Sequence, residues 1–442
     1  MKKILISALS VILGFTIIAI AILNNGGTAK TLYLLNWGEY IDEELFDTFE
    51  DETGIQVIQE CVTSSETMYQ KITAGTTAYD VAIPGDYMIT KLYNENLLYK
   101  LDTQNYDNLR DYDSIFDDNL TLIRQNKMPE TMEYCMPYFW GAYAMIYSTK
   151  YSGNENVVKT NGFKALFDKS LYLDHHAKTG MYNTARWAIS AYLMSNDIDP
   201  NDESFVTDQT VKNQIVKDLK KASFDMWGDD ALKRKTAIGE IDICFTQLGD
   251  FFDAVYLALD EGMGGNVGLD NLPFDVYVPG NTAAFFDGMC IPTTSKHQDY
   301  ANEFINFMLD PDNAFDNALA IGYSPALKSV QQRFIDNPDE EYYSDDNIYV
   351  SLHDLTEKYP YYLNPLLAAG GNISSVSMLE PKESDYLTAC ETIINQTKST
   401  VSSNETLGTA LCIIALSTII ISSAAYISYV IYKKRKKDIE VA

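Results

Sequence analysis

Residues typical of metal sites and common catalytic centres are scarce in this sequence of 442 residues. Only four histidines occur, and the adjacent His175 and His176 are more typical of a solvated loop than of a metal site. The six cysteines include no C-x-x-C spacing and give no disulfide framework for a chain of this size. The motifs G-x-x-x-x-G-K-S/T, G-x-S-x-G and H-E-x-x-H are missing, so we expect neither a metal nor a cofactor.

Basic residues are also few. The 33 lysines and arginines stand against 62 aspartates and glutamates, which gives a net charge of −29. The charged residues of the two ends, among them Asp438 and Glu440, contribute +5, so the region between the ends carries −34. Such an acidic surface repels nucleic acid and attracts cations, and we therefore expect no nucleic-acid partner. Solubility alone also explains an acidic surface, so the charge does not identify a ligand.

The N-terminal segment is long and uncharged. Residues 4–23 follow Lys2 and Lys3 and are long enough, as a helix, to cross a bilayer. Small residues at 27–29 permit cleavage after this segment. A signal peptide and an uncleaved membrane anchor therefore both fit residues 1–29.

The C-terminal segment has the pattern of a transmembrane helix. Residues 407–432 are uncharged, follow a polar linker at 398–406, and precede a basic tail at 433–442. The positive-inside rule predicts that this tail is cytoplasmic. The region between the two apolar segments is therefore predicted to be extracytoplasmic, at the cell membrane.

Strand and helix patterns alternate in this region. Apolar runs at Thr31–Trp37, Ile55–Val62 and Asp80–Pro84 are separated by stretches with helical spacing, the first of which is predicted to begin at Asp42 and end at Gly54. This order predicts an α/β fold with a mainly parallel sheet. Ligands of such sheets bind beyond the carboxyl ends of the strands, so the loops after these strands are candidate ligand contacts.

Later segments continue the alternation. Strands are predicted at Met136–Ser148, Glu240–Thr246 and Gly288–Pro292, and an amphipathic helix within Tyr300–Ala314 that ends at Pro311. The first of these strands is long and contains Gly141, a pattern that indicates a crossover strand.

Aromatic side chains stand beside carboxylates at four predicted strand ends. An organic amine needs both groups, because ammonium groups bind aromatic faces and carboxylates, and apolar carbon chains pack on rings. Each pair alone is better explained by a core aromatic and a helix-capping acid, but four together favour an amine site. The pairs are Trp37 and Tyr40 with Glu39, Tyr87 with Asp86, Phe251 and Phe252 with Asp250, and Phe285 and Phe286 with Asp287.

Four stretches together resemble the spermidine/putrescine-binding proteins of bacterial ABC importers. They read LYLLNWGEYIDEELFDTFEDETGIQV, SSETMYQKITAGTTAYDVAIPGDYMITKL, MPYFWGAYAMIYS and AIGYSPAL, and the similarity covers nearly all of residues 30–395. The N-W-x-E-Y turn and the S-x-E-T-M-Y stretch are the most specific motifs. The resemblance implies a two-lobed periplasmic-binding-protein fold of type II, in which lobes joined by a hinge close on a polyamine.

The resemblance also implies where the chain crosses between lobes. The crossings are expected near Phe139–Tyr143, near Thr282–Phe286 and around Phe334. The expected division is one lobe of residues 30–140 and 286–332 and another of residues 141–285 and 333–397.

A set of ligand contacts follows from the same resemblance. Glu39 is expected to bind one ammonium group, and Asp287 with Asp250 the other. The residues expected to bind ligand are Trp37, Gly38, Glu39, Tyr40, Gly85, Asp86, Tyr87, Thr184, Trp187, Gln247, Asp250, Phe285, Asp287 and Tyr323.

This sequence departs from the family pattern at several of these positions. Gly85 stands where a Ser is common, and Phe285 and Gln247 stand where a Trp is common. Thr184 and Trp187 replace both acids of the D-x-x-E pair that spermidine-type relatives carry. A third ammonium group then has no evident partner, so we expect putrescine to be preferred over spermidine.

The predicted function is binding without catalysis. We expect a membrane-tethered receptor for putrescine or spermidine that delivers its ligand to the permease subunits of an ABC importer. Alternatives are a receptor for another small cationic or polar solute and a ligand-sensing ectodomain, although a tail of ten residues after Tyr432 is short for signalling. An enzyme with paired catalytic carboxylates, such as a glycoside hydrolase, is a further class that no spacing in the sequence supports.

Overall fold

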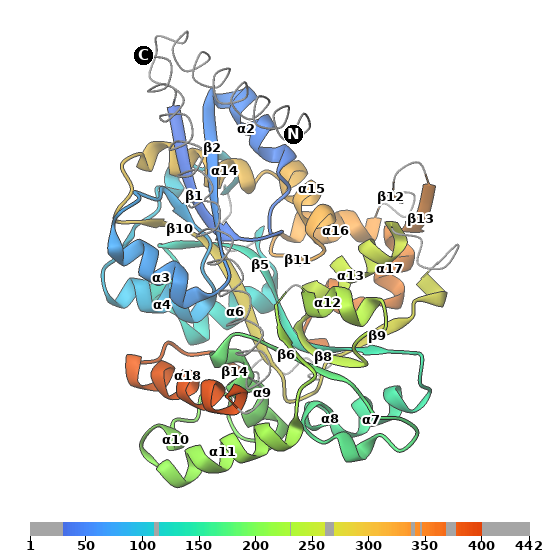
Figure 1. Cartoon of the computed structure of the whole chain (residues 1–442). Helices are drawn as coiled ribbons and strands as arrows, with labels where there is room; N and C mark the ends of the chain where they lie inside the picture. The colour runs from blue at the N-terminus through green and yellow to red at the C-terminus, as the bar shows by residue number, and fades with distance from the viewer. Residues whose placement is uncertain are drawn as a thin grey trace, which may run out of the picture. The chain divides into compact units, whose positions relative to one another are not determined.

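A computed structural model describes residues 30–109, 115–229, 231–260, 269–336, 341–344, 347–367 and 377–399. These residues form two compact units, coloured along the chain in Figure 1. The larger unit contains the described residues up to Asp202 and those from Phe224 to Glu383. The smaller unit contains Glu203–Ser223 and the described residues from Ser384 onward.

A mixed sheet of twelve strands forms the centre of the larger unit. Its order is β2-β1-β3-β10-β5-β8-β6-β7, and four short strands pair with β5 or β10 beside this path. β12 and β13 form a separate two-stranded sheet. The strands are β1 (Lys30–Trp37), β2 (Ile55–Val62), β3 (Val81–Ala82), β4 (Leu98–Tyr99), β5 (Cys135–Ser148), β6 (Thr179–Tyr182), β7 (Met226–Gly228), β8 (Ile243–Gln247), β9 (Phe274–Tyr277), β10 (Ala283–Pro292), β11 (Ser324–Pro325), β12 (Glu341–Ser344), β13 (Asn347–Ser351) and β14 (Ser377–Met378).

Helices connect most of these strands. They are α2 (Glu44–Thr53), α3 (Ser65–Ala74), α4 (Asp86–Asn94), α6 (Asp118–Lys127), α7 (Gly153–Asn161), α8 (Lys164–Phe167), α9 (Ala185–Ser195), α10 (Ser204–Thr207), α11 (Gln209–Ala222), α12 (Ala231–Ala237), α13 (Leu248–Asp260), α14 (Gln298–Met308), α15 (Pro311–Ile321), α16 (Lys328–Asp336), α17 (Leu352–Lys358) and α18 (Ser384–Lys398).

The first strands and helix agree closely with the sequence pattern. β1 and β2 have the predicted bounds to within one residue, and Gly54 ends α2 with a left-handed φ of 71°, a conformation that glycine adopts readily. The predicted N-cap is displaced by one residue: Glu43 holds that position, while Asp42 Oδ1 accepts a hydrogen bond from the Glu44 N–H at 3.0 Å. The amphipathic helix predicted to end at Pro311 is α14, which ends at Met308, and a second helix, α15, begins at Pro311.

The expectation of a mainly parallel sheet is wrong for the centre of the sheet. β1 runs parallel to β2 and β3, and β6 runs parallel to β7 and β8. Between these two groups, β5 and β10 are antiparallel to each other and to their neighbours β8 and β3. The chain passes between the groups along these strands, so their direction follows from the crossover and not from local βαβ connections.

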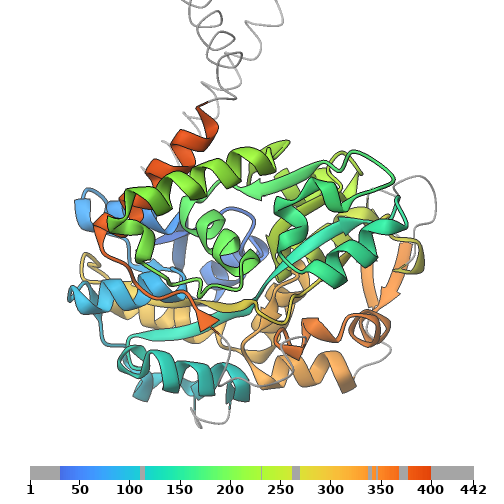
Figure 2. The ribbon, with the colours of Figure 1, turned by 90° about the horizontal axis from the view of Figure 1, so that it is seen from below.

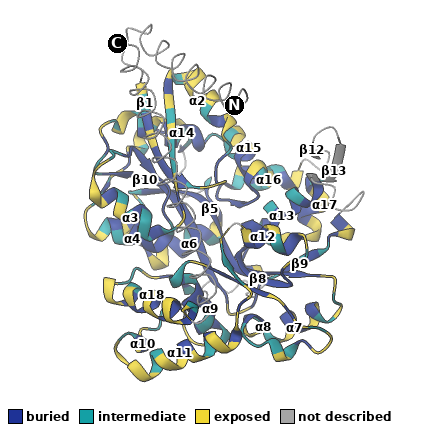
Figure 3. Ribbon diagram, viewed as in Figure 1, coloured by how far each residue is buried: buried dark blue, intermediate teal, exposed yellow. Residues whose placement is uncertain are grey.

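β5 and β10 are buried along their whole length, as the dark blue strands of Figure 3 show. The first part of β5 pairs with β10, and the second part pairs with β8 and β9. A strand buried on both faces reads as a continuous apolar run, which explains the pattern from Met136 to Ser148. Phe49 of α2 packs edge-on against Phe304 and Phe307 of α14, each at 5.2 Å between ring centroids.

The smaller unit is a helical packing of α10, α11 and α18, visible in Figures 1 and 2. Phe205 of α10 and Tyr386 of α18 are buried with their ring centroids 5.1 Å apart. Asp208 caps α11 by accepting hydrogen bonds from the N–H groups of Thr210 and Val211.

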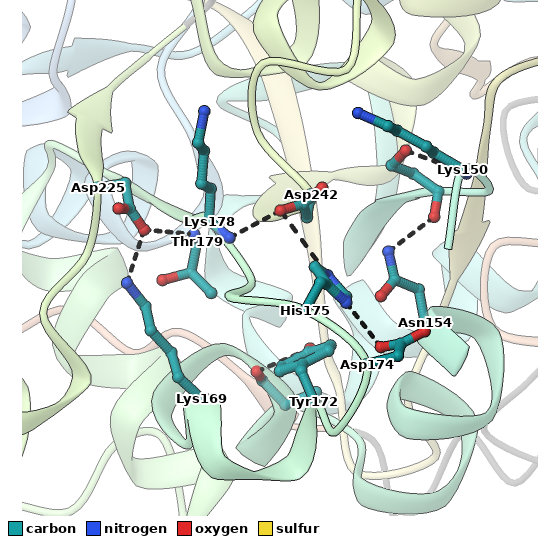
Figure 4. A network of polar contacts seen from close by, with 12 residues as sticks. Lys150, Asn154, Lys169, Tyr172, Asp174, His175, Lys178, Thr179, Asp225 and Asp242 are labelled. Atoms are coloured by element: carbon teal, nitrogen blue, oxygen red, sulfur yellow. Dashed lines mark hydrogen bonds and ion pairs between the residues drawn. The ribbon is translucent and has the colours of Figure 1, made fainter. Parts of the chain in front are cut away.

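A polar network holds the chain that enters β6 (Figure 4). The His175 ring stacks on Tyr151 at 3.7 Å between centroids, and its Nδ1 lies 2.7 Å from Asp174 Oδ1. Asp242 Oδ2 lies 3.8 Å from the other ring nitrogen. The expectation of a solvated loop is correct for His176 but wrong for His175, whose side chain is 7% exposed.

The predicted membrane segments lie outside the described residues. These are residues 1–29, the predicted membrane helix at 407–432 and the basic tail after it. Among the residues that the structure does describe, no helix has the length and apolar character needed to cross a bilayer.

Candidate functional site

A cavity of about 170 Å³ lies in the larger unit, among the loops after β1 and β3, strands β5, β6, β8 and β10, and helices α9, α12 and α13. Every residue of the predicted ligand set lines this cavity, with the exception of Thr184. Thr184 is the N-cap of α9, and Trp187 in the first turn of that helix does line the cavity. The tertiary structure thus brings together residues that are up to 286 positions apart, from Trp37 to Tyr323.

Several lining residues were missed from the sequence. Tyr143 lies in the long apolar run of β5, where the pattern indicates only a buried strand, and Tyr182 ends a strand that was not predicted. Lys233 lies on α12, a helix without a recognisable motif. The missed residues are Cys61, Val62, Thr63, Ser65, Tyr143, Tyr182, Asp229 and Lys233.

Hydrogen bonds and backbone conformation hold the residues after β1 and β3 in place. Trp37 ends β1, and its Nε1–H donates to the Ile83 carbonyl at 2.8 Å. Glu39 has a positive φ of 51°, which turns the chain directly after Gly38. Asp86 begins α4 and accepts a hydrogen bond from the Tyr87 N–H at 2.6 Å, as an acid in a first helical turn does.

An irregularity in the pairing of β10 with β5 lies next to Asp287, which lines the cavity. The register between β10 and β5 shifts between Asp287, which faces Phe139, and Gly288, which faces Pro137. β-Bulges are irregularities of this kind and are common beside functional sites. Gly288 is required there, because a Cβ at this position would lie 2.1 Å from Cys135 Sγ.

Asp287 and Asp86 form a buried acidic pair. Asp287 Oδ2 accepts a hydrogen bond from the Tyr40 hydroxyl at 2.6 Å, which by itself would lower the pKa of this carboxyl. Burial has the larger effect and raises the pKa of Asp287 to about 7. Burial, together with the nearby Asp287 charge, also raises the pKa of Asp86 well above its usual range. Among the described residues, Asp86 Oδ2 is buried without a hydrogen-bond partner. A ligand cation at this pair would lower both pKa values and satisfy that oxygen.

Asp250 is a second acidic group at the cavity, and it is held by neutral donors. Its Oδ2 accepts from the Tyr182 hydroxyl at 2.5 Å, from Thr246 Oγ1 at 2.7 Å and from the Gln247 N–H at 3.2 Å. Its Oδ1 accepts from the Tyr323 hydroxyl at 2.8 Å. These donors orient the carboxylate without neutralising its charge.

The third acidic residue, Glu39, contacts cations of the chain itself. Its Oε1 lies 2.5 Å from Arg234 Nη2, and its Oε2 lies 3.7 Å from Lys233 Nζ. Lys233 Nζ also lies 2.5 Å from Asp253 Oδ2. Burial raises the pKa of Asp253, and Lys233 opposes that rise. The predicted ammonium partner Glu39 is therefore already part of an ion-pair cluster.

Aromatic rings form the walls between these acids. Tyr40 and Tyr323 meet edge to face with ring centroids 4.9 Å apart, and Tyr143 lies 5.5 Å from Phe285. Gly141 opposite Phe285 makes room for that ring, since a Cβ there would lie 2.7 Å from the Phe285 Cζ atom. Rings of this kind can pack on a carbon chain and attract a cation.

The turn that lacks the D-x-x-E acids contains a buried cation instead. Arg186 is 1% exposed, and its Nη2 donates to Asn201 Oδ1 at 2.8 Å. Its charge acts to lower the pKa of Asp86, although burial of that acid outweighs the effect. Next to it, the Trp187 ring meets Tyr182 edge to face at 5.1 Å. The arrangement at this turn supplies aromatic surface and positive charge.

Metal binding finds no support in the part of the chain that the structure describes. Within these residues, no three histidine, cysteine, aspartate or glutamate side chains come together as metal ligands. The cavity instead combines acids with tyrosine hydroxyls and aromatic rings. Carboxylates accept hydrogen bonds from an organic cation, and ring faces attract it.

Comparison with known families gives a match over most of the chain. The family model described as bacterial extracellular solute-binding protein matches residues 44–348. The spermidine/putrescine-binding periplasmic protein of Escherichia coli K12 is 27% identical over 297 residues, covering 66% of this chain and 77% of the relative. The putrescine-binding periplasmic protein PotF of the same organism is 23% identical and covers 73% of this chain and 85% of its own length.

Solved structures agree with this family in fold. The spermidine/putrescine transporter substrate-binding protein PotD of Streptococcus pneumoniae matches with a TM-score of 0.58 and 26% identity, over 84% of this chain and 99% of that one. A putative spermidine/putrescine ABC transporter protein of Listeria monocytogenes matches with a TM-score of 0.61 and 25% identity over the same shares of the two chains. The mixed α/β sheet described above thus has the fold of these substrate-binding proteins.

Proposed function

Because the chain belongs to the bacterial extracellular solute-binding protein family, we propose that it is an extracytoplasmic receptor that binds a polyamine and delivers it to an ABC importer. The relatives named for spermidine and putrescine support the ligand class, since they match across most of their length. The importer's permease subunits are the proposed partners, and binding is the whole of the activity.

The buried acids of the cavity are the observation on which this proposal depends. Asp86, Asp250 and Asp287 are each 3–7% exposed, and among the described residues no ion pair joins any of them to a lysine or arginine. A buried carboxylate without a cation is costly, and burial accordingly raises the pKa of Asp287 to about 7 and the pKa of Asp86 well above its usual range. A diamine with ammonium groups at these acids and its carbon chain against Tyr40 and Tyr323 would remove that cost.

Capture by closure of two lobes is the proposed mechanism. One lobe, residues 30–140 and 286–332, would contribute the loops after β1 and β3, and the other, residues 141–285 and 333–397, would contribute α9, α12 and α13. β5 and β10 pass from one strand group to the other and are suited to act as the hinge.

A membrane tether completes the proposal. Residues 407–432 are uncharged and are followed by Lys433, Lys434, Arg435, Lys436 and Lys437. A helix over this segment would hold the receptor beside its permease with the binding region outside the cytoplasmic membrane.

Titration calorimetry on the full-length chain in detergent tests the proposal. Putrescine, spermidine and spermine are titrated in turn, with neutral amino acids as the comparison class. We expect heat of binding from at least one polyamine and none from the amino acids, and loss of that heat in Asp287→Asn. The matched control is Asp47→Asn, which removes an exposed acid of α2. Binding of a neutral amino acid and of no polyamine would refute the proposal.

A further inference from the structure

Lys233 is a buried ammonium group supplied by the protein to a cavity that is otherwise acidic. Its side chain is 5% exposed and lines the cavity from α12. Lysine is seldom buried to this extent unless it is paired, and here its Nζ lies 2.5 Å from Asp253 Oδ2 and 3.7 Å from Glu39 Oε2. Nothing in the proposed capture of a polyamine requires a lysine at this position.

Among the described residues, Lys233 forms ion pairs with two acids, and Arg234 is its cationic neighbour. Asp253 and Glu39 are in direct or near contact, and the charges of Asp250 and Glu39 act to raise the pKa of Asp253. Arg234 contacts Glu39 from the outer side, where both side chains are about half exposed. This end of the cavity therefore has the acids that would bind a ligand ammonium, and a lysine of the chain already satisfies them.

The remaining acids form two positions. Asp86 and Asp287 make one, and Asp250 makes the other. Tyr40 and Tyr323 link them, since Tyr40 donates to Asp287, Tyr323 donates to Asp250, and the two rings are in edge-to-face contact. Two acidic positions separated by aromatic rings match two ammonium groups separated by a short carbon chain.

A third ammonium group would lack a partner at either end of the cavity. At one end it would meet the positive charge of Lys233, and at the other end Thr184 and Trp187 stand beside the buried cation Arg186. The charges at both ends therefore favour a ligand with two ammonium groups over one with three.

We propose that Lys233 takes the place of a ligand ammonium at the Glu39 end of the cavity, and so restricts this receptor to short diamines and excludes triamines. This inference rests on the proposed function, which it narrows from polyamines to diamines. Lys233 is a specificity-determining residue in this account: it acts by repelling a third ammonium group and by occupying the acids that would bind it.

The test compares the ratio of two affinities in four full-length proteins in the same detergent. Wild type, Lys233→Met, Lys233→Gln and Lys235→Met are each titrated with putrescine and with spermidine. Lys235 is the matched control, since it lies on the same helix but is 40% exposed, pairs with Glu240 and does not line the cavity. Thermal unfolding of each protein shows which variants fold. Two different substitutions of Lys233 are included so that the test still works if one of them does not fold.

We expect wild type and Lys235→Met to bind putrescine at least about tenfold more tightly than spermidine, a difference of about 1.4 kcal/mol. In either folded Lys233 variant, spermidine affinity should rise until the two ligands differ by less than about threefold, because Glu39 and Asp253 become available to the third ammonium group. An unchanged ratio in the Lys233 variants, or wild type that binds spermidine as tightly as putrescine, would overturn the inference while leaving the proposed function intact. Failure of wild type to bind any polyamine would overturn both.

Discussion

Lowering the pH from 7.5 to 5.5 should weaken polyamine binding through Asp287. Burial holds the pKa of this carboxyl at about 7 in the ligand-free protein, so it is largely ionised at pH 7.5 and largely protonated at pH 5.5. An ammonium ligand binds the ionised form and lowers the pKa in the complex. Binding at acidic pH must therefore first remove a proton, and the free energy of that step is lost from the affinity.

The size of the effect follows from the pKa of about 7. Titration of one such group between pH 7.5 and 5.5 lowers affinity by about 25-fold, or about 2 kcal/mol. Asp86 adds to this loss, because its pKa is also raised by burial. Replacement of Asp287 by Asn should remove the Asp287 part of the pH dependence and cost about 2–5 kcal/mol of binding free energy at pH 7.5.

The raised pKa of Asp287 makes the ligand-free protein more stable at low pH, whereas it makes ligand binding weaker there. A carboxyl whose pKa is raised on folding stabilises the fold below its unfolded pKa, and that stabilisation is lost as the pH rises through about 7. Above pH 7 the ionised Asp287 therefore costs up to about 4 kcal/mol of the free energy of unfolding. Asp287→Asn should leave the ligand-free protein as stable as wild type or more stable there, so its loss of binding cannot be attributed to unfolding.

Calorimetry in two buffers with different ionisation enthalpies measures both the affinity and the protons released. Near pH 6, we expect at least about one proton to be released for each ligand bound to wild type, because Asp86 adds to the contribution of Asp287, and fewer from Asp287→Asn. Asp47→Asn, which alters an exposed acid, should reproduce the wild-type pH profile. The reasoning is refuted if wild-type affinity is the same at pH 7.5 and 5.5 without proton release, or if Asp287→Asn keeps the wild-type affinity and pH slope.

Three further predictions concern the Trp37 ring beside the cavity, the packing of Gly249 against Tyr323, and the orientation of the chain in the membrane. Trp37→Ala should weaken amine binding by about 1–2 kcal/mol through loss of ring contact, while the unfolding temperature stays near that of wild type; an unfolded variant would show that the ring is core. Gly249→Ala should lower both stability, by about 1–3 kcal/mol, and affinity, because the new Cβ would lie 2.2 Å from the ring of Tyr323, whose hydroxyl donates to Asp250; wild-type behaviour of this variant in both assays would contradict the packing. Protease added to intact cells should digest the binding region and spare an epitope fused after Ala442, and digestion of that epitope would contradict the predicted membrane helix.

Local patterns in the sequence were sufficient for much of the framework. The bounds of β1 and β2, and the end of α2 at Gly54, follow from hydrophobic spacing and from the conformational freedom of glycine, which depend on neighbouring residues alone. The positions of Glu39 and Asp86 were located for the same reason, since each comes a few residues after an apolar strand. Their motifs also indicated the family before the fold was known.

Only the tertiary structure decided how the acids of the site behave. Asp287 lies in β10, which pairs with β5 from more than a hundred residues earlier in the chain, and its burial in the assembled sheet raises its pKa. Lys233 and Tyr143 join the cavity through a helix and a strand whose own sequences show no ligand motif. Desolvation and ion pairing depend on which groups, distant in the sequence, surround a side chain. The spacing of apolar residues along the chain does not reveal these groups. For this reason the sequence by itself determined which strands, loops and acids are present, whereas the tertiary structure decided that Glu39 contacts Lys233 and Arg234, while among the described residues Asp86, Asp250 and Asp287 line the cavity without an ion pair to a lysine or arginine.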